Sequence, residues 1–552
     1  MDLVTPPTSD AFSFALSPDG RQLAFVANGE KGSQLWLRAL DQATAQALAG
    51  TEGASFPFWA PDNRAVGFLA DGKLKRVNVG GGAPQVLADA ATARGGTWNR
   101  DGVIVFGQAS PGALMRVTAS GGAPSPVTQV TAGQGSHRWP QFLPDGQRIL
   151  FFVQSGDPQV RGVYLASLDG GELTRIVEAA TAAVYAPGYL LRVSQGVLIS
   201  QPFDAARVAL AGEPIPVAQD VGVDDGLFRS SVSVSALGVL AHRSGVGSRR
   251  QLVWLDRTGK LLGNLGPPDE SFVAGPALAS DGGRVAVGRI VQGNADVWLI
   301  DVGRAVMSRF TFSAEVDRLP IWSPDGNRIV FQSTRTGVAD LFQKPASGAA
   351  DEQPLTVSPQ PKSALDWSSD GRVLLYASLD SKTQADLWAV SLTGDRKPVP
   401  VVRTSFDDVQ GQLSPDGRWL AYASNESGRY EIYVQSFPDA GGKWQVSTAG
   451  GIYPRWRRDG RELYYIDPDK RLTAVPILVT ANTRTVDAGA PVALFSTRLA
   501  VGPNIFTTGL YSRAQYAVAA DGRFLMNVQA DDAVASPITV VLNWEAGLTS
   551  SR

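Results

Sequence analysis

The chain has 552 residues and a formal net charge of −2, and only 18% of its residues are charged. This near-neutral balance excludes a global field that would attract nucleic acid or an anionic membrane. The absence of cysteine excludes disulfides, thiolate catalysis and cysteine-based zinc sites, and it suits an oxidising compartment. No apolar run reaches the roughly 18 residues of a membrane span, and we find no secretory leader after Met1.

A phrase built on a Pro-Asp-Gly turn recurs along the chain. Its clearest copy, SPDGRWLAYAS from Ser414, joins the turn to an apolar run typical of a β-strand. Clear copies start at Ser17, Ala60, Leu143 and Ser323, and weaker ones start at Asn99, Ser280, Ser368, Arg457 and Ala519. The chain is therefore organised as a tandem repeat.

The spacing of the turn aspartates gives the repeat length. Asp19, Asp62, Asp101 and Asp145 lie 43, 39 and 44 residues apart, and the steps from Asp281 to Asp459 are 44, 45, 46 and 43. The gap of 136 residues between Asp145 and Asp281 fits two degenerate copies, which we place at 189–199 and 232–241. Twelve repeats of roughly 40–45 residues are typical of four-stranded β-propeller blades.

The second repeat shows the strands expected in each copy. Residues 56–59 form the innermost strand, and the turn 60–63 leads to a second strand at 65–69 that is apolar throughout. Residues 74–79 alternate in polarity and indicate a third strand with one solvated face. Three glycines then lead to an outer strand at 85–88. No segment has convincing helical periodicity.

Twelve blades exceed the four to eight that usually close one propeller. We therefore predict an all-β protein with two tandem propellers of four-stranded antiparallel blades, six in each, with a seven-plus-five division left open. The predicted domains are 1–268 and 269–552, with the boundary near 266–270. The run 538–544 is expected to complete the last blade, and 471–477 is expected to form a third strand followed by a long loop.

The Pro-Asp-Gly repeats resemble the TolB-like, WD-repeat-like propeller family of bacteria over nearly the whole chain. Longer phrases, such as SHRWPQFLPDG from Ser136 and SNESGRYEIYVQSFP from Ser424, are similar to the C-terminal extracytoplasmic propeller region of acidobacterial eukaryotic-like serine/threonine protein kinases. The resemblance implies a sensor module in the periplasm or at the cell surface, tethered to a membrane span and a kinase outside this sequence. The chain has no Gly-rich phosphate loop, HRD-type loop or DFG triplet, so kinase activity is not expected of it.

Few residues offer catalytic chemistry. The chain lacks a G-x-S-x-G pentapeptide and contains only two histidines, His137 and His242. His137 precedes Arg138-Trp139 at the start of an inner strand, which is expected to open onto the central channel. Carboxylates of the second half at similar positions would suit weak Ca²⁺ binding or acid/base work, although loop capping is favoured; these are Glu315, Asp317, Asp366, Asp407 and Asp408. We predict no catalytic residue, no metal ligand set and no cofactor.

Binding is the function that remains. Loops entering the inner strands converge on one face of each ring, and arginines beside aromatic residues suit a peptide, a carboxylated ligand or a glycan. In the first ring the candidates are Phe56, Arg94, Trp98, His137, Arg138, Tyr185 and Arg229. In the second ring they are Arg318, Asp366, Asp407, Gln410, Tyr453, Arg455 and Arg513.

The preferred function is a non-enzymatic binding or sensing module for a protein, peptide or saccharide at the channel mouth. The alternative is a propeller-type polysaccharide lyase or glycoside hydrolase that uses His137 or the carboxylates of the second ring. A pure scaffold for partner proteins is a third option. No nucleic acid and no membrane insertion of this segment are expected. The ligand, the ring that binds it and the oligomeric state stay open, because propellers have many functions.

Overall fold

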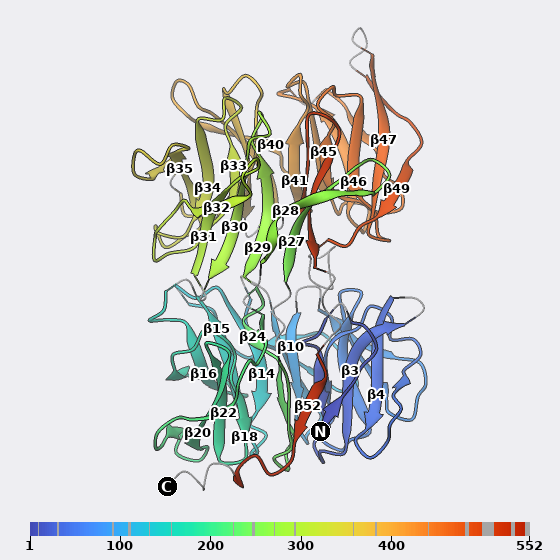
Figure 1. The fold of residues 1–552 in the computed structure, drawn as a ribbon, viewed down its shortest axis with the longest axis vertical. Helices are drawn as coiled ribbons and strands as arrows, with labels where there is room; N and C mark the ends of the chain where they lie inside the picture. Colours follow the sequence, from blue (N-terminus) through green and yellow to red (C-terminus); the bar gives the residue numbers. More distant parts are fainter. Residues whose placement is uncertain are drawn as a thin grey trace. The chain divides into compact units, whose positions relative to one another are not determined.

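The computed structural model is all-β, and no helical element occurs in the part of the chain that it describes (Figure 1). The described residues are 1–8, 10–29, 32–90, 93–108, 112–131, 133–155, 157–224, 226–244, 249–269, 271–291, 294–356, 358–380, 383–439, 441–480, 485–499, 513–530 and 536–546. None of these residues forms a helix long and apolar enough to cross a membrane. The all-β prediction and the four-stranded antiparallel sheets are confirmed.

The chain forms two compact units. The first unit contains Met1–Ser248 and, from the C-terminal segment, strand β52 (Ile538–Val541). Four of its sheets follow chain order: β2 (Phe14–Leu16), β3 (Gln22–Gly29), β4 (Gly32–Ala39) and β5 (Gln46–Ala47); β6 (Ser55–Trp59), β7 (Ala65–Ala70), β8 (Lys73–Asn78) and β9 (Gln85–Asp89); β10 (Ala93–Trp98), β11 (Val103–Gln108), β12 (Met115–Thr118) and β13 (Ser125–Pro126); β14 (Ser136–Phe142), β15 (Arg148–Gln154), β16 (Gly162–Ser167) and β17 (Thr174–Val177).

The remaining strands of the first unit are less regular. They are β18 (Val184–Ala186), β19 (Tyr189–Ser194), β20 (Val197–Asp204), β21 (Ala209–Leu210) and β22 (Ile215–Ala218), the two-stranded β23 (Val223–Asp224) and β24 (Arg229–Ser230), and the sheet of β25 (Val232–Val234), β26 (Leu240–Arg243), β52 and β1 (Asp2–Leu3). The degenerate repeats predicted at 189–199 and 232–241 thus contain strands, as expected.

The second unit begins at Arg249, and its strands also pair in antiparallel sheets. They are β27 (Arg250–Leu255), β28 (Leu261–Asp269), β51 (Phe524–Gln529) and β50 (Tyr516–Val518); β29 (Phe272–Leu278), β30 (Arg284–Val291), β31 (Asn294–Asp301) and β32 (Val306–Arg309); β33 (Asp317–Trp322), β34 (Arg328–Ser333), β35 (Asp340–Pro345) and β36 (Gln353–Pro354); β37 (Lys362–Trp367), β38 (Val373–Asp380), β39 (Gln384–Ser391) and β40 (Pro398–Val402); β41 (Asp408–Leu413), β42 (Trp419–Ser424), β43 (Glu431–Ser436) and β44 (Lys443–Gln445); β45 (Ile452–Trp456), β46 (Glu462–Ile466), β47 (Arg471–Thr480), β48 (Thr485–Ala488) and β49 (Val492–Ser496).

The inner strands of the second unit form a closed ring. Consecutive strands β29, β33, β37, β41 and β45 contact one another, and β50 contacts both β45 and β29. The apolar side chains of each blade pack against the next blade, as Trp322, Ile329 and Phe331 do against Ala286 and Val297. This radial packing of four-stranded sheets is the architecture of a β-propeller.

In four copies of the Pro-Asp-Gly turn, a serine and an aspartate link the inner strand to its second strand. In the copy at Ser414, the serine hydroxyl donates to Asp416 at 2.5 Å and accepts the Trp419 N–H at 2.9 Å. Asp416 also accepts the Arg418 N–H, and Gly417 adopts a φ of 69°, which glycine tolerates without strain. The same bonds at Asp325, led by the one from the Ser323 hydroxyl, lower the pKa of that carboxyl.

The chain termini depart from the expected order. Strand β52 pairs with β26 and with β1, so the C-terminal run completes a sheet of the first unit and not the last blade of the chain. The second unit is closed by β51, which pairs with β27. The two units therefore differ from the predicted ranges 1–268 and 269–552, because the boundary lies before Arg249 and the C-terminal strand returns to the first unit.

A recurring β-bulge shapes the inner strands. One extra residue interrupts the pairing of β6, β10, β14, β29, β33, β41 and β45 with their second strands. The bulged residue has a positive φ in each strand: Phe56, Gly95, Trp139, Gly275, Leu319, Gln410 and Tyr453. A bulge re-aims a side chain and bends the strand, so these positions set the lining near the start of each channel.

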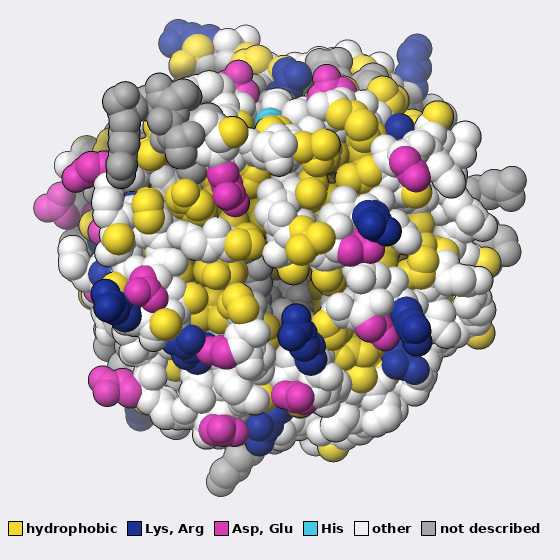
Figure 2. Space-filling view, turned by 90° about the horizontal axis from the view of Figure 1, so that it is seen from below, with side chains coloured by type: hydrophobic (Ala, Val, Ile, Leu, Met, Phe, Trp, Pro, Cys, Tyr) yellow, Lys and Arg dark blue, Asp and Glu magenta, His cyan; other side chains and the backbone are white. Residues whose placement is uncertain are grey.

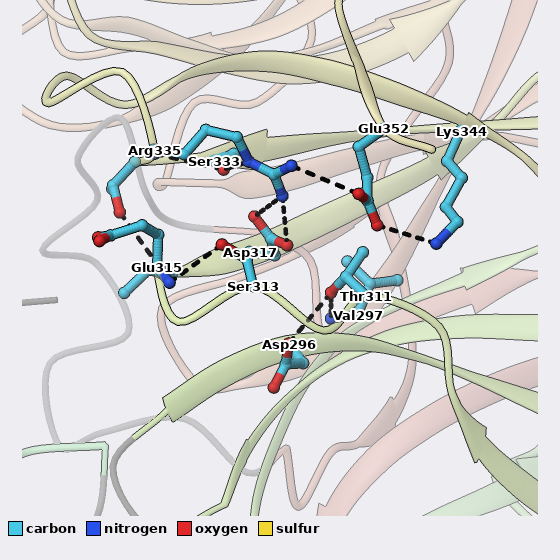
Figure 3. Close-up of polar contacts among 12 residues, drawn as sticks. Asp296, Val297, Thr311, Ser313, Glu315, Asp317, Ser333, Arg335, Lys344 and Glu352 are labelled. Carbon is cyan, nitrogen blue, oxygen red and sulfur yellow. Dashed lines mark hydrogen bonds and ion pairs between the residues drawn. The ribbon is translucent and has the colours of Figure 1, made fainter. Parts of the chain in front are cut away.

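Polar side chains bond to one another near the start of the inner strands, and Asp317 also interacts with Thr311 of the preceding blade. In the second unit, Asp317 is fully buried and receives two hydrogen bonds from Arg335, at 3.0 and 2.8 Å (Figure 3). Arg335 also reaches Glu352, which pairs with Lys344 at 2.9 Å. In the preceding blade, the Thr311 hydroxyl accepts the Val297 N–H at 3.0 Å and donates to Asp296 at 3.3 Å. These bonds give the carboxylates at this position partners within the fold.

Candidate functional site

The first unit encloses a central cavity of about 680 Å³. It is lined by residues of the inner strands β2, β6, β10, β14, β18 and β25 and by the turns that follow them. Its walls are rich in aromatic rings: Phe12, Phe14, Phe56, Phe58, Trp59, Trp98, Trp139, Phe142 and Tyr185. A concave site with aromatic walls and a few polar groups is the usual form of a ligand pocket.

The cavity opens among the Pro-Asp-Gly turns. Turn residues at its rim include Pro18, Pro61, Asp101, Asp145 and Ala236, of which the last three are exposed. In Figure 1 strand β14 points toward the face that Figure 2 views directly. Figure 2 shows hydrophobic side chains around a central hollow on this face, with charged side chains of both signs scattered among them. We call this opening the turn-side mouth.

A buried arginine forms the floor of the cavity. Arg229 donates to Asp10 at 2.6 Å and lies 3.5 Å from Asp224. Its guanidinium also lies over the rings of Phe12, Phe56 and Trp139, with Cζ-to-centroid distances of 5.2, 4.8 and 5.3 Å. These three rings come from different inner-strand segments, so a single cation holds them together at the channel axis.

The hairpin of β23 and β24 contacts the floor from the other side. The Leu227 carbonyl accepts the Trp139 indole N–H at 2.8 Å, and the Phe228 carbonyl accepts the Ala182 N–H at 2.9 Å. Phe228 stacks on Phe152 with centroids 5.8 Å apart. The hairpin thus contacts segments on several sides of the channel, which closes the end where the inner strands start.

The floor needs a glycine beside Trp139. Gly95 has a φ of +76°, and a Cβ placed there would lie 2.6 Å from Cε3 of Trp139. A side chain at this position would therefore clash with the indole and strain the backbone. Gly95 lets Trp139 lie flat against the bulge of β10.

Side chains of one inner strand satisfy backbone groups of the next. Thr97 accepts the Phe142 N–H at 3.1 Å, and Gln141 accepts the Tyr185 N–H at 2.7 Å. Each inner strand is an edge strand with unpaired N–H groups, which are costly to leave without partners. These bonds make the channel wall continuous and hold the aromatic residues in place.

Four of the seven residues predicted in the first unit border the cavity, and Arg138, Arg94 and His137 have other contacts. Phe56, Trp98 and Tyr185 line the cavity, and Arg229 forms its floor. Arg138 is buried, donates to Ser136 at 2.6 Å and lies over Phe228. Arg94 donates to the carbonyl of Ala93, and burial followed by the nearby Arg229 lowers its pKa to about 10.

His137 does not face the channel, contrary to expectation. Its side chain is fully buried against Phe151, with Nδ1 2.7 Å from the Thr128 hydroxyl and Nε2 2.9 Å from Gln134. Thr128 in turn accepts the Leu114 N–H at 2.9 Å. His137 therefore occupies the same inter-blade position as Asp317 of the second unit. It lies two residues before the bulge, where side chains point into the blade interface.

Burial lowers the pKa of His137 to about 4. A folded-state pKa below the unfolded value of about 6.5 means that stability is complete above pH 6.5 and is lost as the pH falls toward 4. We expect His137 to account for a loss of about 3 kcal/mol in the free energy of unfolding between pH 7 and pH 4. Urea unfolding at both pH values should show a smaller loss in His137→Gln than in the wild type. Equal losses in the two proteins would contradict this assignment.

In the second unit, four predicted residues bond to neighbouring groups. Arg318 donates to Gln332 at 2.7 Å, and Asp407 accepts the Tyr430 hydroxyl at 3.1 Å. Gln410 accepts the Tyr453 N–H at 2.7 Å. The other three, Asp366, Arg455 and Arg513, lie within electrostatic range of one another.

Sequence reasoning missed several groups that build the first channel. Asp10 and Asp224 hold Arg229, Trp139 adopts the bulged conformation, and Gln141 bridges two strands. Trp139 and Gln141 could have been considered from the sequence, because both lie in the phrase SHRWPQF, a few residues after His137. Asp10 and Asp224 had no such signal, because they lie outside the repeated phrase. Within the described residues no group of three His, Asp or Glu side chains is arranged to hold a metal ion.

Comparison with known proteins supports a TolB-like propeller. Residues 269–400 match the family model described as the TolB beta propeller domain. Among solved structures, a putative TolB from Agrobacterium tumefaciens is 15% identical with a TM-score of 0.40, covering 51% of this chain and 98% of that one. TolB from Acinetobacter baumannii is 14% identical with a TM-score of 0.36, covering 63% and 79%.

An oligogalacturonate lyase from Vibrio parahaemolyticus is 13% identical with a TM-score of 0.33, covering 62% of this chain and 90% of that one. These similarities are too distant to carry an argument about function.

Proposed function

We propose that this protein is a non-enzymatic binding module whose first unit takes a peptide, a protein segment or a saccharide through the turn-side mouth. The single observation that carries this proposal is the cavity of about 680 Å³, which is lined by aromatic rings and open at one end. Its volume falls within the range of pockets that hold small ligands or chain segments. Aromatic rings offer a large contact area at a low cost in side-chain entropy.

The contacts of the candidate catalytic groups favour binding over the carbohydrate-active alternative. His137 bonds to Thr128 and Gln134, and Asp407 bonds to Tyr430. At the cavity rim, hydrogen bonds and the ion pair with Arg148 lower the pKa of Asp145 against the opposing effect of its burial. A general acid at this rim would instead need a raised pKa.

The cellular role we propose rests on the sequence resemblance. A ligand-binding propeller outside the cytoplasm, connected to a membrane span and a kinase beyond this sequence, would act as the sensor part of a bacterial signalling protein. A freestanding envelope protein that binds a partner at the same mouth is the other form of this role. In both forms the ligand contacts the turns and the aromatic wall.

Ala236→Trp tests this function, because Ala236 lies at the rim of the cavity and is exposed. An indole there should obstruct the mouth and weaken binding at least about tenfold, without disturbing a buried group. The measurement is the binding of fluorescently labelled protein to a peptide array and to a glycan array. Leu237→Trp is the matched control, because Leu237 is 74% exposed and lies outside the cavity lining. Equal binding by both variants would contradict the proposal.

A further inference from the structure

Three charged side chains project from the inner-strand ring of the second unit. Asp366 lies on β37 and Arg455 lies on β45, each just after a bulge, while Arg513 precedes β50. Each side chain is partly accessible to solvent. The Asp366 carboxylate accepts the Leu413 N–H of β41 at 2.8 Å, which fixes it along the channel wall.

Arg513 extends along this wall over two neighbouring strands. Its Nη1 donates to the Leu319 carbonyl of β33 at 2.9 Å. Its aliphatic stem passes over Gly275 of β29, where an added Cβ would lie 3.1 Å from Arg513 Cδ. Gly275 has a φ of +61°, so its missing side chain both permits the bulge and leaves room for the arginine.

The charges in this group do not balance. Burial and, to a smaller extent, the nearby Arg455 lower the pKa of Arg513 to about 9. Burial also raises the pKa of Asp366 to about 6, although both arginines act in the opposite direction. Among the described residues, no ion pair within 4.0 Å joins Asp366 to either arginine. Two guanidinium groups thus lie within electrostatic range of a single carboxylate.

We propose that Arg455 and Arg513 form a binding site for a single carboxylate group of a ligand, and that Asp366 controls its affinity. A guanidinium group binds a carboxylate through directed hydrogen bonds. Among the described residues, Nη1 of Arg455 donates to the Pro454 carbonyl and Nη1 of Arg513 donates to the Leu319 carbonyl. Each guanidinium has further N–H groups that can donate to a ligand. This site is separate from the aromatic channel of the first unit.

An ionised Asp366 is expected to weaken the binding of a carboxylate, and a neutral Asp366 is expected to strengthen it. Above pH 6 its carboxylate is ionised and repels an incoming anion, whereas below pH 6 it becomes neutral and leaves both arginines unopposed. The other titratable groups facing this cluster are Tyr453 on β45 and Tyr516 on β50, and burial raises the pKa of Tyr516. The Tyr516 phenol therefore stays neutral between pH 5 and pH 7.5. The affinity for a carboxylate should therefore rise as the pH falls.

Trifluoroacetate is a suitable probe, because it is a carboxylate that stays ionised at these pH values and can be followed by ¹⁹F NMR. We expect saturable binding to the full chain that is about tenfold tighter at pH 5 than at pH 7.5. The neutral amide trifluoroacetamide should not bind. Arg513→Gln and Arg455→Gln should each weaken binding about tenfold, whereas the exposed Arg458→Gln should leave it unchanged.

Asp366→Asn separates this site from general charge effects. Asparagine keeps an oxygen that can accept the Leu413 N–H, so the wall should stay intact, which a urea unfolding curve checks. This variant should bind at pH 7.5 about as tightly as the wild type binds at pH 5 and should lose the pH dependence. Binding that is the same in Arg513→Gln and the wild type, or unchanged pH dependence in Asp366→Asn, would overturn the proposal.

Discussion

Replacement of Arg229 by methionine is expected to lower the free energy of unfolding of the first unit by about 3–5 kcal/mol. The substitution leaves the carboxylates of Asp10 and Asp224 without their cation, and both are largely buried. It also removes the guanidinium that Phe12, Phe56 and Trp139 share. Urea unfolding followed by tryptophan fluorescence measures the change, because Trp139 lies in the affected floor.

Two variants make this result interpretable. Arg229→Lys keeps the charge but not the planar group that contacts the rings, so we expect an intermediate loss. Arg207→Met removes an arginine that is 86% exposed and lies 3.7 Å from Asp204, so it should change stability by less than about 0.5 kcal/mol. A loss below about 1 kcal/mol in Arg229→Met would contradict the role we assign to the floor.

Replacement of Arg335 by methionine should destabilise the second unit by about 3 kcal/mol at pH 7.5. Asp317 has no exposed side-chain surface, and Arg335 supplies two of its hydrogen bonds. Without that cation a carboxylate stays buried in the interface between two blades (Figure 3). The measurement is again the free energy of unfolding from urea titration.

The pH dependence of this variant should differ from that of His137→Gln. Burial already raises the pKa of Asp317, and loss of Arg335 should raise it further. A carboxyl with a raised folded-state pKa contributes stability that is present at low pH and is lost as the pH rises through that value. The deficit of Arg335→Met should therefore shrink between pH 7.5 and pH 4.5. Adding Asp317→Asn should recover most of it at pH 7.5, and a deficit that persists in the double variant would contradict this explanation.

The blade architecture could be predicted because each of its causes is local. Pro and Gly mark the turn, the serine and aspartate bond within five residues, and the second strand is apolar on both faces. The same short phrase recurs at an even spacing, so the strands of one copy locate those of the others. The return of β52 to the first unit had no local signal, because the pairing of Ile538 with Leu3 and Arg243 joins distant parts of the chain.

The candidate site was predicted only in part. Phe56, Trp98 and Tyr185 lie on inner strands, and their side chains line the cavity as the repeat period suggests. The bulge shifts the facing of residues around it, which is why Trp139 belongs to the floor and His137 to the blade interface. The hairpin of β23 and β24, which contacts the floor of the cavity near the end where the inner strands start, was not predicted. That hairpin lies in the most degenerate repeats.

The claim that ligands enter the first unit through the turn-side mouth can be tested with one thiol. The chain contains no cysteine, so Val184→Cys would place a single reactive group on the channel wall. The measurement is the rate at which a small methanethiosulfonate reagent modifies this cysteine, with and without the tightest ligand from the peptide and glycan arrays. We predict that saturating ligand slows the reaction at least about tenfold and that Ala236→Trp slows it without ligand. An unchanged rate in both cases would contradict the account.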